Sequence, residues 1–216
     1  DELDSLHHKG KFIRLAEQAG LPVPATETFA SPDGWLPLLQ DERYREGIVL
    51  KPAYSRFASR VMMIDLRKDG GRKFGSGPTG PSPWSGSSVG SGGLGGSGAL
   101  RALDVSGAIP HLPEILRRLE TSGISPERPW VAQAMLRGDE WCTYGVAHGG
   151  ELTAFAAYRS RFRAGAGASI HYAAVSHPEL LDWVRRFVRH TNFTGQIAFD
   201  FMAAADGTVL PMECNP

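Results

Sequence analysis

The sequence predicts an α+β fold built from antiparallel sheets, and two observations indicate it. Apolar runs of strand length follow one another across tight glycine turns, as at Gly149-Gly150 and Asp206-Gly207, and such turns join antiparallel neighbours. Segments with apolar residues at helical spacing stand apart from these runs. Helices separate from hairpin-paired strands are typical of α+β proteins.

The composition excludes several classes of protein. Lysine plus arginine and aspartate plus glutamate both number 23, so the overall charge favours no nucleic-acid partner. The two cysteines, Cys142 and Cys214, lack the spacing of a zinc site or a disulfide framework. No apolar run could span a bilayer, and no signal peptide is recognisable. We therefore expect a cytoplasmic protein without nucleic-acid or membrane partners, and its oligomeric state stays open.

The N-terminal part is predicted to be helix, strand and short helix. The expected elements are a helix over roughly 8–19, a strand over 26–29 and a short helix over 31–39. Asp4 or Ser5 is expected to cap the first helix and Gly20 to end it. Ser31 is expected to cap the short helix, with Pro32 as its first residue.

The middle of the chain combines two strands with a low-complexity stretch. The expected elements are strands over 47–52 and 61–64 and an amphipathic helix over 110–120. Between them, residues 75–98 are nearly all glycine and serine. Such a segment cannot bury enough apolar area to offset its ordering entropy. We expect a flexible loop there, either natural or engineered.

The C-terminal part is predicted to be a strand, two hairpins and a helix. The expected elements are a strand over 130–136, a hairpin of 140–147 with 151–158, a helix over 178–190, and a hairpin of 195–202 with 210–216. Arg159, Arg161 and Arg163 alternate past the first hairpin. Because side chains alternate along a strand, they are expected to share one face.

The last hairpin carries three oxygen-bearing side chains. Asp200 lies on its first strand, and Glu213 and Asn215 lie on its second. Alternation puts Glu213 and Asn215 on one face and Cys214 on the other, and the turn brings Asp200 near Glu213. Two carboxylates and an amide oxygen suit Mg²⁺. The alternative is a polar edge strand.

Four features stand in order along the chain: Lys9 at a helix start, Lys51 at a strand end, Gln133-Ala134-Met135-Leu136 before Gly138-Asp139-Glu140, and the Asp200, Glu213 and Asn215 hairpin. Together they resemble the ATP-grasp superfamily, and the hairpin is similar to the metal-binding hairpin of D-alanine–D-alanine ligases. The resemblance covers nearly the whole chain outside the Gly/Ser stretch. It implies two subdomains, each with an antiparallel sheet and flanking helices, that grip a nucleotide between them. We expect entry helices in 1–46, a small lid subdomain in 47–135 and a truncated C-terminal subdomain in 136–216.

The resemblance also implies a role for each residue. ATP is the expected cofactor, with Mg²⁺ or Mn²⁺ held by Asp200, Glu213 and Asn215. The residues implied to bind the nucleotide are Lys9, Lys51, Ser55 and Arg56 at the phosphates, Val49, Met202 and Met212 around the adenine, Gln133, Ala134, Met135 and Leu136 as the hinge that reads the adenine through backbone groups, and Glu140 at the ribose. Arg159 and Arg161 are the catalytic candidates over the transferred phosphoryl group.

Two positions depart from the family pattern. The loop after Lys51, residues 53–60, contains no glycine, whereas family members usually have a Gly- and Ser-rich phosphate loop there. His8 stands where the family often has aspartate before the lysine.

The reaction implied is that of a carboxylate–amine ligase. A small-molecule carboxylate attacks the γ-phosphate of ATP to give an acyl phosphate and ADP, and an amine then displaces phosphate. Two alternatives remain: a non-catalytic ATP- or ADP-binding module, and an enzyme that activates bicarbonate. The identity of the acid and of the acceptor lies outside what these residues predict.

Overall fold

The computed structural model describes residues 2–55, 60–67, 109, 111–163, 169–204 and 206–216. The predicted flexible stretch 75–98 and the candidate Arg56 lie outside the described residues. The candidate Arg161 lies on a described strand, but its side chain is not described.

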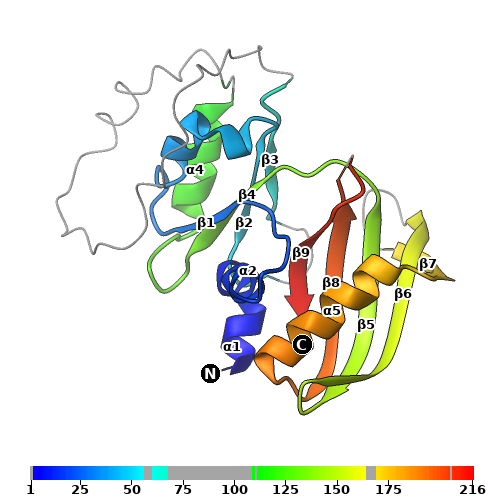
Figure 1. Ribbon diagram of the computed structural model, residues 1–216. Helices are drawn as coiled ribbons and strands as arrows, with labels where there is room; N and C mark the ends of the chain where they lie inside the picture. The colour runs from blue at the N-terminus through cyan, green and yellow to red at the C-terminus, as the bar shows by residue number, and fades with distance from the viewer. Residues whose placement is uncertain (1, 56–59, 68–108, 110, 164–168, 205) are drawn as a thin grey trace.

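Two antiparallel sheets form the frame of the molecule (Figure 1). The small sheet has the strand order β1-β4-β2-β3, with β1 Thr26–Phe29, β2 Ile48–Pro52, β3 Met62–Ile64 and β4 Trp130–Ala134. The large sheet has the order β7-β6-β5-β8-β9, with β5 Glu140–His148, β6 Glu151–Arg163, β7 Ser169–Val175, β8 Gly195–Ala203 and β9 Val209–Asn215. The predicted α+β class with antiparallel sheets is confirmed.

Helices cover one face of each sheet (Figure 1). They are α1 Glu2–His7, α2 Lys9–Gln18, α4 Leu112–Thr121 and α5 Pro178–Thr191, with the short 3₁₀ helices η1 Leu36–Gln40 and η2 Glu42–Tyr44. None of the helices in the described part of the chain is long and apolar enough to cross a membrane.

Two details at the N-terminus differ from the prediction. Asp4 and Ser5 lie inside α1, and His8 caps α2 by accepting a hydrogen bond at Nδ1 from the Lys11 backbone N–H. The predicted helix over 31–39 is a turn followed by the 3₁₀ helix η1. Ser31 does not cap it, because its hydroxyl donates to the Asp33 carboxylate instead.

Two separate apolar cores hold the helices on the sheets. Under the large sheet, rings from α2, α5 and β8 pack edge to face, stacked or tilted, with centroids 5.0 to 6.3 Å apart; they belong to Phe12, Trp183, Phe187, Phe199 and Phe201. Such aromatic pairs add to the stabilisation from area burial. The small sheet has its own core, which includes Trp35, Tyr44 and Leu50. Asp200 and Glu213, which alternate with the core residues Phe199, Phe201 and Cys214, lie on the other face of the large sheet.

Gly138, in the turn between β4 and β5, lies against the backbone of β8. Its φ is +157°, and a Cβ there would lie 1.6 Å from the Ala203 carbonyl oxygen. We expect Gly138→Ala to lower the free energy of unfolding by at least about 3 kcal/mol, because backbone must shift to relieve the clash. Gly149→Ala is the matched control, since Gly149 has φ +54° and no atom within 4 Å of the added Cβ, and should cost about 1 kcal/mol. Chemical denaturation measures both, and equal losses would contradict the close approach.

Candidate functional site

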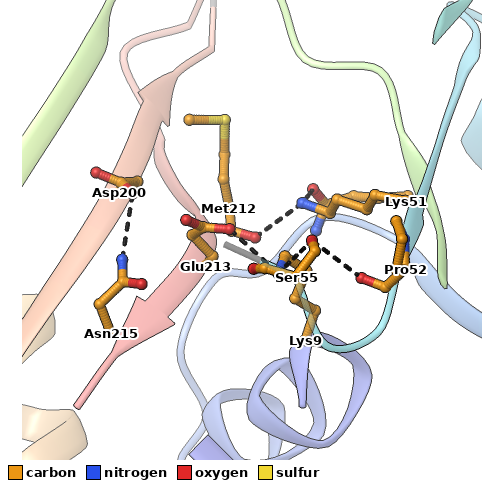
Figure 2. Close-up of polar contacts among 9 residues, drawn as sticks. Lys9, Lys51, Pro52, Ser55, Asp200, Met212, Glu213 and Asn215 are labelled. Carbon is orange, nitrogen blue, oxygen red and sulfur yellow. Dashed lines mark hydrogen bonds and ion pairs between the residues drawn. The ribbon is translucent and has the colours of Figure 1, made fainter. Parts of the chain in front are cut away.

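The hairpin of β8 and β9 places the three predicted metal ligands together. Asp200 lies directly opposite Glu213, and Ala198 lies opposite Asn215. The Asn215 amide nitrogen lies 3.4 Å from an Asp200 carboxylate oxygen (Figure 2). Cys214, between them in sequence, is buried on the other face. The strand register therefore agrees with the prediction that Asp200, Glu213 and Asn215 come together on one face of the hairpin.

A β-bulge in β9 sends two consecutive side chains to the site. The register shifts between Asp200 and Phe201, so that Met212 and Glu213 together span one position of β8. Both are half-buried, whereas their neighbours Pro211 and Cys214 are buried in the core. A bulge places an extra residue in one strand and re-aims its side chain. Met212 thereby joins Glu213 near the site, which regular alternation would not allow.

Lys51 bridges the two sheets. Its Nζ donates to the Gln133 side-chain carbonyl at 3.0 Å and to the Met212 backbone carbonyl at 3.0 Å (Figure 2). Gln133 lies on β4 of the small sheet, and Met212 lies on β9 of the large one. Only 7% of Lys51 is exposed, so its charge sits in a desolvated position between the sheets.

Lys9 brings a second buried cation to the same place. Its Nζ donates to the Ser55 carbonyl at 2.9 Å and to the Ser55 hydroxyl at 3.2 Å, and lies 3.3 Å from a Glu213 carboxylate oxygen (Figure 2). It is 4% exposed. Helix α2 positions it by packing against β9. Gly10 permits a close approach to β1, because a Cβ there would lie 2.3 Å from the Thr28 hydroxyl.

Burial changes the acid–base properties of the site. Desolvation lowers the pKa of Lys51 from 10.5 to about 8, although the carboxylates of Glu213 and Asp200 oppose that shift. Burial also raises the pKa of the Asp200 carboxyl, and the charge of Glu213 raises it further. The Cys142 thiol lies opposite Asp200 on β5, and its pKa is raised by burial and by that carboxylate. An arriving anion would favour the charged form of Lys51.

This shift predicts a pH dependence of ATP affinity. If Lys51 contacts the ATP phosphates as the sequence predicts, only its protonated form attracts them, so ATP affinity should fall as pH rises through about 8, by up to about tenfold per pH unit. Titration calorimetry between pH 7 and 9.5 measures it. The Lys51→Met variant is the control and should bind weakly with little dependence on pH. A wild-type affinity that stays flat across this range would contradict the assignment of Lys51 to the phosphates.

The residues predicted around the adenine lie on the two facing sheets. Val49 is half-buried on β2, while Met202 on β8 lies directly opposite Glu140 of β5. In the predicted hinge, the Ala134 N–H donates to the Ala25 carbonyl and the Met135 N–H donates to the Gly47 carbonyl. Since these two N–H groups are already paired, a purine would hydrogen-bond to other backbone groups of residues 133–136. Leu136, at the end of this segment, is half-buried.

Arg159 is not brought into this group. It follows Tyr158, which lies opposite Cys142 and so shares the Asp200 face; alternation puts Arg159 on the opposite face, the one that packs on α5. Its guanidinium lies 5.3 Å from the Trp141 ring centroid and pairs with the Asp139 carboxylate.

Gln133 contributes to the site in a way that was not predicted, and two residues beside the predicted ones were not predicted at all. The Gln133 side chain, not only its backbone, contributes by holding Lys51. Cys142 borders Asp200, and Met63 lies opposite Val49 on the exposed face of β3. Gln133 carried a usable signal, because it is a lone polar residue in the apolar run Trp130 to Leu136. The positions of Cys142 and Met63 beside predicted residues follow only from the strand register.

The oxygen donors fit a divalent cation. Carboxylates and an amide oxygen on one face are ligands that Mg²⁺ accepts, usually together with waters and substrate phosphates. Within the described ranges, no group of three or more His, Cys, Asp or Glu could hold a metal ion by itself. A site of this kind therefore depends on Asn215 and on oxygens that the ligand supplies.

A cavity of about 280 Å³ opens beside this group. It is lined by His7, Lys9, Tyr54, Ser55, Cys214 and Asn215. Its walls thus include one of the two buried lysines and one predicted metal ligand.

Solved structures with the same architecture include ATP-grasp ligases. An L-amino acid ligase from Bacillus licheniformis matches 99% of this chain and 41% of its own, at 15% identity and TM-score 0.57. The ATP-grasp ligase PsnB, complexed with a minimal precursor, Mg and ADP, matches 96% of this chain and 49% of its own, at 16% identity and TM-score 0.54. N5-carboxyaminoimidazole synthase from Aspergillus clavatus, in complex with ADP and 5-aminoimidazole ribonucleotide, matches 99% and 45%, at 12% identity and TM-score 0.58.

These likenesses establish the fold. The chain has the ATP-grasp fold, as the sequence resemblance predicted. It spans 41% to 63% of the length of the solved chains that it matches here. No protein-family model matches the chain, and no curated protein sequence matches it significantly.

Proposed function

We propose that this chain is the ATP- and Mg²⁺-binding core of an ATP-dependent ligase that joins a carboxylate to an amine. One observation carries the proposal: two buried lysines, from α2 and β2, contact the hairpin of Asp200, Glu213 and Asn215 inside an ATP-grasp fold. Lys9 contacts the Glu213 carboxylate, and Lys51 contacts the Met212 carbonyl. Buried cations beside carboxylates suit the binding of a polyphosphate with its metal ion.

Each part of the site has a distinct task in this proposal. Lys51 and Lys9 neutralise phosphate charge, and Asp200, Glu213 and Asn215 hold Mg²⁺ or Mn²⁺. The metal ion supplies charge stabilisation as the γ-phosphoryl group is transferred. Val49, Met202 and Met212 enclose the adenine, residues 133–136 read it, and Glu140 receives the ribose hydroxyls.

The reaction needs positioning more than covalent help from side chains. A carboxylate oxygen attacks the γ-phosphorus, the bond to the β-phosphate bridging oxygen breaks, and ADP leaves with the electron pair. The amine then attacks the acyl carbon, phosphate leaves, and the amine proton is lost. Fixed charges that already face the phosphates stabilise the transition state without reorganisation.

Substrate-dependent ADP release tests the proposal. With ATP and Mg²⁺, ADP should form only when both a carboxylate and an amine are present. ADP release that needs bicarbonate and no other acid would instead indicate a bicarbonate-activating enzyme. Nucleotide binding without ADP release on any acid and amine panel would contradict the ligase assignment.

The position of Arg159 favours one second candidate, a non-catalytic nucleotide-binding module. Arg159 is held by Asp139 and Trp141 on the face away from Asp200, so the phosphoryl group is left without this cation. We propose a cytoplasmic location and small-molecule partners in either case. The free thiols of Cys142 and Cys214 support a reducing compartment.

A further inference from the structure

Lys9 places its ammonium group beside Glu213, one of the proposed metal ligands. Its Nζ lies 3.3 Å from a Glu213 carboxylate oxygen. The Lys9 side chain is 5% exposed and that of Glu213 is 29% exposed. An ion pair in which one partner is buried and the other is partly buried is screened less by solvent and salt than an exposed pair. A metal ion that binds the same Glu213 oxygen must therefore replace this ammonium group, and one that binds the other oxygen is repelled by it.

The same lysine also fixes the start of the loop that follows β2. Its Nζ donates to both the carbonyl and the hydroxyl of Ser55, and its backbone N–H donates to the Ala53 carbonyl at 3.0 Å. Ser55 is the last described residue before 56–59. Lys9 thus connects α2, the loop and the metal hairpin through a single side chain (Figure 2).

We propose that the Lys9 ammonium group acts as a counter-cation at the metal site. Nucleotide phosphates must draw it away from Glu213 before the metal ion binds tightly. This inference rests on the proposed function, because it assumes that phosphates arrive beside Lys9. Metal and nucleotide then bind interdependently: the metal ion alone competes with Lys9, whereas phosphates offer Lys9 another anionic partner. Linkage requires each ligand to strengthen the other by the same factor.

Metal binding in the absence of turnover tests this inference. Mn²⁺ affinity of the full chain is measured by electron paramagnetic resonance, with and without a non-hydrolysable ATP analogue, for wild type and Lys9→Met. Wild type should bind Mn²⁺ weakly alone and much more tightly with the analogue. Lys9→Met should bind Mn²⁺ alone about tenfold more tightly than wild type, given the coupling energies of close charge pairs.

Two further variants test whether the change in Mn²⁺ affinity comes from the Lys9 charge itself. One controls for loss of structure, and the other controls for loss of general positive charge. Lys9→Gln removes the charge while its amide can still donate to the Ser55 carbonyl, and it should also tighten Mn²⁺ binding if Lys9→Met does not fold. Lys11→Met removes an equal charge from the exposed side of α2, where Lys11 pairs with Asp4, and should leave Mn²⁺ affinity unchanged.

Unchanged or weaker Mn²⁺ affinity in both folded Lys9 variants would overturn this inference and leave the proposed function intact. Equal tightening in Lys11→Met would also overturn it, because general electrostatics would then suffice. Failure of wild type to bind the nucleotide analogue at all would overturn the proposed function, and this inference with it.

Discussion

Replacing Lys51 with methionine is expected to weaken ATP binding about a hundredfold, equivalent to about 2.8 kcal/mol. The Lys51 ammonium group is desolvated between β4 and β9, where it is hydrogen-bonded to Gln133 and Met212. A charge-assisted contact to phosphate in such surroundings is stronger than one at an exposed site. Methionine keeps an unbranched apolar side chain, so the change removes the charge with little loss of packing.

Titration calorimetry with ATP and Mg²⁺ measures the effect. Lys11→Met is the control, because it also removes one positive charge. Lys11 lies on α2 and pairs with Asp4 at the surface. It should alter ATP affinity less than about twofold. Similar losses in both variants would show that general charge, and not the position of Lys51, controls nucleotide binding.

Replacing Asp200 with asparagine is expected to remove the metal dependence of nucleotide binding and to lower any ADP formation by two to three orders of magnitude, roughly. Asparagine is nearly isosteric with aspartate but lacks the negative charge that a divalent ion needs. Asp200 faces Glu213 and contacts the Asn215 amide, so its replacement leaves Glu213 as the remaining carboxylate of the three predicted ligands.

Asp206→Asn is the matched control within the same hairpin. Asp206 lies in the exposed turn, where its carboxylate accepts the Thr208 backbone N–H. Its replacement should cost some stability but should leave the dependence of ATP affinity on Mg²⁺ unchanged. The Asp200 assignment is wrong if Asp200→Asn still binds ATP more tightly with Mg²⁺ than without it.

Much of the fold could be predicted because local patterns decide it. The β8–β9 hairpin follows from the Asp206-Gly207 turn, and its register brings Asp200 opposite Glu213 as expected. The helix predicted over 178–190 is α5, with Leu180, Val184 and Phe187 buried. These elements depend on periodicity and turn chemistry, which the sequence carries within a few residues.

The site was harder to predict because long-range contacts and strand irregularities shape it. The bulge at Met212 and Glu213 interrupts the alternation of β9. Arg159 looked available by spacing, but the register of β5 and β6 puts it over Trp141. The ion pair between Lys9 and Glu213 joins residues from opposite ends of the chain, and no local pattern encodes such a contact.

The central claim is that Lys9, Lys51 and the Asp200–Asn215 hairpin form one nucleotide–metal site. The binding of ATP in the presence and absence of Mg²⁺ tests this claim most directly. For the wild-type chain, calorimetry should give a 1:1 complex with Mg²⁺ and a Kd of roughly 1 μM to 1 mM, the range usual for enzyme substrates. Without Mg²⁺ the affinity should fall at least about tenfold. Absence of ATP binding to the folded chain, or binding indifferent to Mg²⁺, would contradict the claim.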